Sequence, residues 1–287
     1  MSMAGRVLDK NIVYERKTTM NRHLFSMCCV ASVVLGICQV ASAGTETFFP
    51  LGRSLVEDQK SLPIPCGFGV NYYYQRQGYD MTKIKLTPDV SQLFPLNPSD
   101  LSVKSRINEV NFKLDVWVLP FLNLFAIVGR VEESTRVSNI PHPQLSTLQY
   151  DDSGNLYGGG ATFAYGIRHF WASLTVADSY ADLNNSDSWI QAFVITPKVG
   201  ARVDTPWPGK GLNVWVGGTF QRAEEEHTGN WNVPGLGQLK YDVTLKESEP
   251  LNVVAGLGTD LWGRVALEVE LGFGEREQLL TSLNYRF

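Results

Sequence analysis

The sequence predicts an all-β chain that folds as a transmembrane antiparallel β-barrel of about ten strands, in one domain over residues 66–287. Three observations point to this fold. Apolar and polar residues alternate along segment after segment, which is the period of a strand with two different faces. The connections between these segments are tight and roomy in turn. The last alternating segment runs to Phe287, so the chain ends within a strand.

Residues 1–43 are interpreted as an N-terminal extension followed by a cleaved signal peptide. The short basic stretch 21–23 precedes an apolar run, 24–40, and the small residues 41–43 form a cleavage site. The apolar run is short for a membrane-spanning helix, which needs ~20 residues. We interpret the polar stretch before Met20 as an over-extended gene start, with a genuine long basic region as the alternative.

Cysteine content and charge exclude several classes of protein. Three of the four cysteines lie within the first 43 residues, so Cys66 alone follows and no disulfide framework is expected. The first 43 residues hold five basic and two acidic side chains, so the net charge of −4 becomes about −7 for the remainder. That balance disfavours nucleic-acid binding. The mean hydropathy of −0.10 fits either a soluble protein or a barrel whose strands each have one polar face.

The strand pattern begins at Cys66. The stretch before it, 44–65, has no clear period, and its prolines predict an extended periplasmic lead-in. The clearest alternation occurs in five segments: 66–75, 109–118, 212–221, 265–274 and 277–287. Five more fit less cleanly: 122–137, 156–168, 170–181, 189–204 and 250–261. Together they make about ten strands.

The connections indicate which end of the barrel is which. The tight ones are Leu119–Phe121, Arg168–His169, Pro206–Lys210 and Leu261–Gly263. The roomy ones are Asp80–Ser102, Ser138–Asn155, Asp182–Ser188 and Glu224–Glu249, with the short Gly274–Arg276 as the last. Outer-membrane barrels have short periplasmic turns and longer outer loops, so both termini are expected on the periplasmic side. Aromatic residues near the tight ends predict an interfacial belt: Trp117, Phe121, Phe170, Trp171, Trp207 and Trp262.

Alternation alone leaves open which face points inward, because a soluble barrel is apolar inside and a membrane barrel is polar inside. The polar face here holds charges of both signs and many glycines, which favours a narrow, filled lumen. Burying an unpaired charge costs several kcal/mol, so these groups are expected to pair across strands, although each alone could be a solvated surface charge. The lumen-lining candidates are Glu109, Lys113, Asp115, Arg130, Arg168, Lys198, Arg202, Glu268 and Glu270.

No catalytic residue, cofactor or metal site is predicted. His142 lies near Asp151 and Ser153, which allows a His–Asp pair as in omptin proteases or a Ser–His pair as in outer-membrane lipid deacylases, but the local patterns of those families are missing. His169 lies at a tight turn. His227 follows the run Glu224–Glu226 and is interpreted as part of a solvated acidic patch, with divalent-cation binding as the alternative.

Several motifs resemble those of a family of uncharacterised proteobacterial outer-membrane proteins. They are the turn segment Asp115–Phe125, Tyr157–Thr162, Pro197–Gly200, Leu212–Gly217, Gln221–Glu226, Leu271–Gly274 and the end Tyr285–Phe287. The resemblance covers most of 66–287 and implies export to the outer membrane. It implies no substrate. In outer-membrane barrels the terminal aromatic, here Phe287, also serves as the assembly signal.

The sequence therefore predicts an integral outer-membrane protein of a Gram-negative bacterium. Its expected partners are outer-membrane lipids and the barrel assembly machinery, with a permeant that the sequence does not identify. A barrel of ten strands leaves at most a thin path, because about eight strands give a filled interior and 16–18 an open channel. The leading hypothesis is a narrow or gated channel with a charged lumen. The alternatives are an adhesion or binding barrel acting through its outer loops, and an outer-membrane hydrolase.

Overall fold

The computed structural model describes residues 50–52, 54, 62–88, 97–141, 147–184, 188–205, 211–233 and 237–287. The expected signal peptide, His142 and the tight turn 206–210 with Trp207 lie outside them. Among the described residues no helix is long and apolar enough to span a membrane. The strands are β1 Cys66–Thr87, β2 Ser102–Leu119, β3 Leu122–Ser138, β4 Thr147–Ile167, β5 Phe170–Leu183, β6 Trp189–Asp204, β7 Gly211–Val233, β8 Gly237–Glu247, β9 Leu251–Asp260, β10 Val265–Phe273 and β11 Glu277–Arg286.

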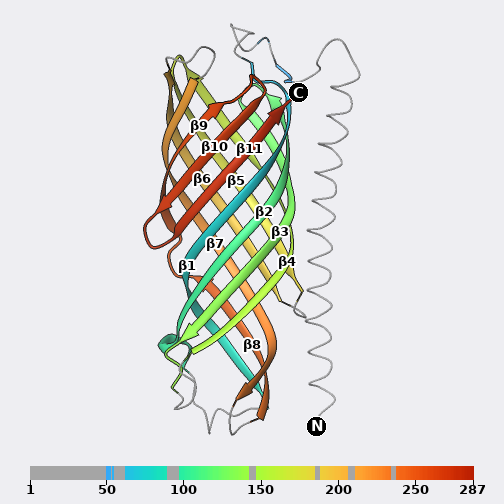
Figure 1. Ribbon diagram of the computed structural model, residues 1–287, viewed down its shortest axis with the longest axis vertical. Helices are drawn as coiled ribbons and strands as arrows, with labels where there is room; N and C mark the ends of the chain where they lie inside the picture. The colour runs from blue at the N-terminus through green and yellow to red at the C-terminus, as the bar shows by residue number, and fades with distance from the viewer. Residues whose placement is uncertain are drawn as a thin grey trace.

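The strands form one antiparallel sheet that closes into a barrel (Figure 1). Closure comes from β1 and β11, where Gly67 pairs with Arg286 and Arg76 with Glu277. The backbone N–H of Phe287 also donates to the carbonyl of Cys66 at 3.0 Å. The alternating end of the sequence is therefore the closing strand, and every strand in this part of the barrel has two neighbours.

The number of strands in the wall changes along the barrel. Near the termini ten strands form the ring, because β7 pairs with β9 and β1 pairs with β11. Farther along, β8 takes the place of β9, β10 and β11 and pairs with both β7 and β1. The β10–β11 hairpin ends where β8 and β1 meet (Figure 1). The barrel thus continues as an eight-stranded section beyond the ten-stranded one.

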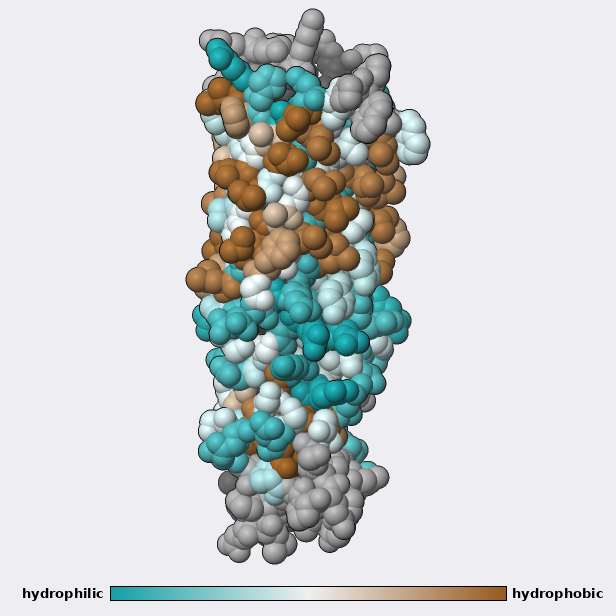
Figure 2. All heavy atoms as spheres, turned by 60° about the vertical axis from the view of Figure 1, so that its left-hand side comes forward, coloured by the Kyte–Doolittle hydropathy of each residue, from teal (hydrophilic) through white to brown (hydrophobic). Residues whose placement is uncertain are grey.

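An apolar belt surrounds the ten-stranded section. Outward-facing Phe112, Val128 and Val216 are 60%, 57% and 56% exposed. Figure 2 shows this belt over one half of the molecule and a hydrophilic surface over the other. A closed barrel with an exposed apolar belt buries that surface in lipid, because only closed barrels and helices satisfy their backbone polar groups there. The protein is an integral outer-membrane β-barrel.

Beyond the belt, the polarity of the two faces is reversed. On β3 the outward residues after Val128 are polar, beginning with Arg130, whereas inward Val131 and Val137 are buried. Two inward apolar clusters fill this section. The first, called the inner cluster, is Ile107, Val131, Leu156, Ala181, Leu183 and Ile190. The second, called the outer plug, is Tyr79, Met81, Leu101, Val103, Val137, Ile140, Ala223, Leu239, Val243 and Leu245.

The tight turns after β2, β4 and β9 are confirmed, but three of the expected outer loops contain long stretches of strand. Residues of the expected loop Asp80–Ser102 extend β1 to Thr87, those of Ser138–Asn155 begin β4, and those of Glu224–Glu249 form the end of β7 and all of β8. Charged and small polar residues led to the loop prediction. They fit strands here because this wall faces water on its outer side.

Candidate functional site

Most of the predicted lumen residues lie on inward-facing strand positions. On β2, Asp115 is buried, and Glu109 and Lys113 share its face at even spacing. Lys198 and Arg202 share the inward face of β6, with Arg202 near the mouth on the side of the tight turns. On β10, Glu268 and Glu270 alternate with the exposed Leu271 on the other face.

Asp115 is the centre of a charged layer near the end of the barrel that holds the tight turns and the C-terminus (Figure 1). Its carboxylate lies 2.9 Å from Nη2 of Arg286 and 3.9 Å from Nζ of Lys113. The amide of Asn123 donates to the same carboxylate at 2.8 Å. Arg286 is on β11, Asp115 on β2 and Asn123 on β3, so this layer joins both sides of the closing seam. The expected pairing of lumen charges across strands is confirmed for Asp115 and Arg286.

A second charged layer is built around Glu270. Its carboxylate lies 2.5 Å from Nζ of Lys198 and accepts a hydrogen bond from the Trp215 indole at 2.6 Å. Lys198 Nζ lies 5.7 Å from the Trp215 ring centroid, which is within the range of a cation–π contact. This layer connects β6, β7 and β10. Glu268, on the same face of β10, has an exposed side chain at the lumen mouth.

Two predicted lumen residues and two predicted belt residues are placed differently. Arg130 is exposed on the outside of β3, because the polar face turns outward beyond the membrane belt. Arg168 lies in the turn between β4 and β5 at a positive φ of 55°, where it ends a strand and does not line the lumen. The Arg286 guanidinium lies over the Trp117 ring, 5.9 Å from its centroid. The ring centroids of Trp171 and Trp215 are 6.1 Å apart. Both rings therefore lie inside the barrel and not in the belt.

A cavity of about 290 Å³ lies between the charged layers and the outer section. One side of its lining is apolar and includes members of the inner cluster, such as Ile107 and Leu156. The other side carries Tyr73, Glu109 and Glu270 along with neutral polar groups. Its volume is near the lower end of the ~300–1,000 Å³ typical of small-ligand pockets. Farther along the barrel, the side chains of the outer plug fill the interior.

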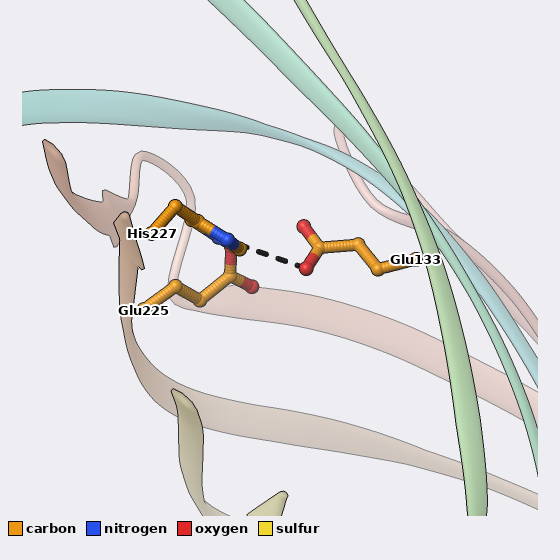
Figure 3. Close-up of side chains that lie close together, drawn as sticks. All are labelled: Glu133, Glu225 and His227. Carbon is orange, nitrogen blue, oxygen red and sulfur yellow. Dashed lines mark hydrogen bonds and ion pairs between the residues drawn. The ribbon is translucent and has the colours of Figure 1, made fainter. Parts of the chain in front are cut away.

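Next to the cavity, at the level of the outer plug, lies a buried acidic cluster of Glu133, Glu225 and His227 (Figure 3). His227 Nε2 is 3.3 Å from Glu225 Oε2 and 3.6 Å from Glu133 Oε2. Glu225 and His227 are two residues apart on β7 and therefore share its inward face, while Glu133 reaches across from β3. All three side chains are at most 2% exposed.

Hydroxyl groups hold the Glu133 carboxylate on one side. Ser105 and Thr135 both donate to Glu133 Oε1, at 2.7 and 2.5 Å. Glu133 Oε2 and Glu225 Oε1 have no hydrogen-bond partner among the described residues. The His227 ring packs against Tyr150 at a centroid distance of 5.0 Å. A buried acceptor left unpaired costs ~1–3 kcal/mol, so this cluster is not optimised for stability alone.

The cluster lies outside the membrane belt, within the section whose outer surface is hydrophilic. Burial, and next the neighbouring Glu133 carboxylate, raise the pKa of Glu225 to about 7. Burial alone lowers the pKa of His227, but Glu133 and Glu225 outweigh that effect and raise the pKa above its ordinary value.

The interpretation of His227 as part of a solvated acidic patch was wrong. Three consecutive acidic residues, 224–226, suggest a surface patch in the sequence. In a strand, however, consecutive side chains alternate between the two faces. Glu225 and His227 point inward, while Glu224 is about two-fifths exposed and pairs with Lys246 on the outside. The two-residue spacing was the available signal. No sequence pattern predicted the part played by Glu133, because its proximity to β7 depends on how the barrel closes.

Arg276 is a further buried group that sequence reasoning missed. It lies in the β10–β11 turn and is fully buried, and its three guanidinium nitrogens have no hydrogen-bond partner among the described residues. Its neighbours of opposite or potential negative charge are Tyr73, Tyr79 and Glu247. The hairpin tip thus projects a cation into the barrel at the point where the wall narrows to eight strands.

No protein-family model and no curated protein sequence matches the chain. Solved structures of similar architecture are outer-membrane barrels. The β-domain of the Bordetella autotransporter Brka is 9% identical with a TM-score of 0.44, over 77% of this chain and 99% of that one. An outer-membrane channel from Pseudomonas putida F1 is 12% identical with a TM-score of 0.34, over 81% and 100%. The Ralstonia pickettii toluene transporter TbuX is 9% identical with a TM-score of 0.33, over 79% and 90%. Similarity at this level says nothing of what this barrel binds or passes.

Proposed function

We propose that the barrel is a gated, selective conduit for small molecules or ions. The observation that supports this most is the 290 Å³ cavity in the middle of the lumen, with one apolar and one charged side. A site of mixed lining favours small molecules that carry both an apolar part and a polar group. The paired charges at its periplasmic side, with Lys198 and Glu270 foremost, act as the selectivity region.

In this proposal the outer plug is the gate. Leu239 and Leu245 are fully buried in it and close the lumen above the cavity. An apolar constriction can stop permeation by excluding water without blocking the path sterically. A conducting state then requires the plug to loosen, while the ten-stranded section keeps its wall intact.

Single-channel recording in a planar bilayer tests both parts. The wild type is expected to show rare, discrete openings, and Leu245→Ala is expected to open more often because it removes packing from the plug. Glu270→Gln should shift ion selectivity toward anions, because it leaves Lys198 unpaired in the lumen. Glu277→Gln is the matched control, since Glu277 is exposed on the outer surface at the tip of the β10–β11 hairpin, 3.9 Å from Arg76. Silence from wild type and Leu245→Ala in folded form would refute the conduit.

We also propose, as a second candidate, a surface-binding role for the section beyond the belt. A membrane strand needs ~9–11 residues, whereas β1 has 22 and β7 has 23. The excess lifts the outer loops well above the lipid. Cells displaying the barrel should then adhere to a target surface, and replacing the connection between β1 and β2 by a short glycine–serine linker should abolish adhesion. Adhesion that survives this replacement would contradict the role.

A further inference from the structure

We propose that Glu133, Glu225 and His227 form a binding site for a divalent transition-metal ion of the Zn²⁺ type. The three side chains come from strands on opposite sides of the eight-stranded section and converge inside it (Figure 3). Each can offer one ligand atom, and these atoms all lie within 4.8 Å of one another. The site is independent of whether the barrel conducts.

The two ligand spacings that involve His227 fit a tetrahedral ion. Zinc binds imidazole nitrogen and carboxylate oxygen at about 2.0–2.2 Å, so two ligands of a tetrahedral site lie about 3.4 Å apart. His227 Nε2 lies 3.3 Å from one carboxylate oxygen and 3.6 Å from the other. Three protein ligands leave a fourth position for water or a solute. Calcium is a poor fit, because it takes 6–8 oxygen ligands.

The surroundings support binding in two independent ways. Ser105 and Thr135 fix one oxygen of Glu133 and leave Oε2 directed at His227, as partners outside the ligand shell of a metal commonly do. Glu225 Oε1 is buried and has no hydrogen-bond partner among the described residues. Two carboxylates and a neutral imidazole would also balance the charge of a divalent cation.

The cavity provides a route to the site. Val131 and Ala223 line its outer end. They precede Glu133 and Glu225 by two residues on the same inward faces of β3 and β7. An ion that enters the mid-lumen cavity therefore meets the cluster at the level where the outer plug begins, since Glu225 pairs with Leu245 and His227 with Val243.

The test is metal binding by the whole chain, exported by a bacterial host and purified from its outer membrane in detergent. Titration with Zn²⁺ after chelator treatment should give one ion per chain, and Ca²⁺ should bind far more weakly. Glu133→Gln and His227→Gln should each lose at least ~100-fold in affinity, and Thr135→Val ~10–100-fold. Glu224→Gln, one residue from Glu225 but on the outer face, and His169→Ala should bind as wild type.

Two results would overturn the site: wild type that takes up no stoichiometric Zn²⁺, or binding that the cluster variants leave unchanged. Circular dichroism establishes that each variant is folded. Should the variants fail to fold, X-ray absorption of the Zn²⁺-loaded wild type decides, because the cluster supplies one imidazole and two carboxylates. A spectrum with one imidazole supports the site, and a spectrum with two or more places the ion elsewhere.

Discussion

Asp115 shows how much one buried charge contributes to closing this barrel. Its carboxylate faces Arg286 of the last strand at 2.9 Å and is 1% exposed. Removing one partner of a buried ion pair costs about 3–5 kcal/mol, because the other charge is left uncompensated. We expect Asp115→Asn to lower the free energy of unfolding by about 3 kcal/mol, measured by urea titration in lipid vesicles.

Asp260→Asn is the control for that measurement. Asp260 lies 4.0 Å from Arg202, and both side chains are more than a third exposed at the mouth. Pairs in such positions contribute about 0–1 kcal/mol. Equal losses for the two variants would show that Asp115 acts through general packing and not through its pairing with Arg286.

The buried cluster predicts a dependence of stability on pH in the presence of a chelator. Glu225 has a pKa of about 7 in the folded chain against an ordinary value of 4.5, so the folded state binds more protons than the unfolded state between these values. Stability must therefore fall as pH rises through this window. The raised pKa of His227 acts in the same direction, since its stabilisation is lost as pH rises through the folded pKa.

The expected loss between pH 4.5 and 7 is on the order of 3 kcal/mol, read as a shift of the urea midpoint. Glu133, Asp152, Tyr79, Tyr150 and Tyr241 are the other titratable groups around the cluster. Glu225→Gln should flatten the curve, because it removes the group whose pKa differs most. A wild-type barrel that becomes more stable over this range would show that the cluster is already neutralised by another charge.

At the scale of strands, the alternation of residues predicted the ten-stranded section well and the outer section poorly. The closing strand, the tight turns and the inward Asp115 follow from period two and turn residues alone. Arg130 could not be placed correctly, because the same alternation describes a strand in lipid and a strand in water, with its faces exchanged. β8 was missed because its charged residues face water on one side while Leu239 and Leu245 fill the interior. Only the position of the belt, a property of the closed sheet, separates the two cases.

Close packing between neighbouring strands depends on Gly256 of β9. A Cβ at this position would lie 2.4 Å from ring atoms of Trp215 on β7. That ring donates its N–H to Glu270 and is held by Lys198, so it has no free direction in which to move. We expect Gly256→Ala to displace the indole, to lower stability by about 1–3 kcal/mol, and to shift tryptophan fluorescence to the red.

Gly258, two residues along the same face of β9, provides the comparison. A Cβ there would lie 3.0 Å from Cγ of Glu268, which has an exposed side chain, and 3.3 Å from Cζ3 of Trp215, a looser contact with the indole than at Gly256. Gly258→Ala should therefore change both stability and fluorescence less than Gly256→Ala does. Similar effects of the two substitutions would indicate that strand propensity, and not the Trp215 ring, sets the need for glycine.

At the scale of the whole molecule, the position of the belt determines what each face meets, and we expect the hydrophilic section beyond it to lie outside the cell. On β7 the outward Val216 lies in the belt, and Glu224 lies eight residues farther along the same face. At ~3.4 Å per residue these positions are about 27 Å apart along the strand, which at a tilt of ~35–45° is about 20 Å along the barrel axis, most of the height of a ~25 Å apolar band. Trp262, 77% exposed, marks the turn at the opposite end.

A membrane-impermeant maleimide on intact cells should therefore label Glu224→Cys, spare Val216→Cys because lipid covers it, and reach Trp262→Cys only after the outer membrane is opened. Cys66 is fully buried and should give no background. Labelling of Trp262→Cys in intact cells would reverse the barrel and place the acidic cluster on the periplasmic side. In that case an ion would approach the cluster from the periplasm through the outer plug, and the mid-lumen cavity would open toward the outside.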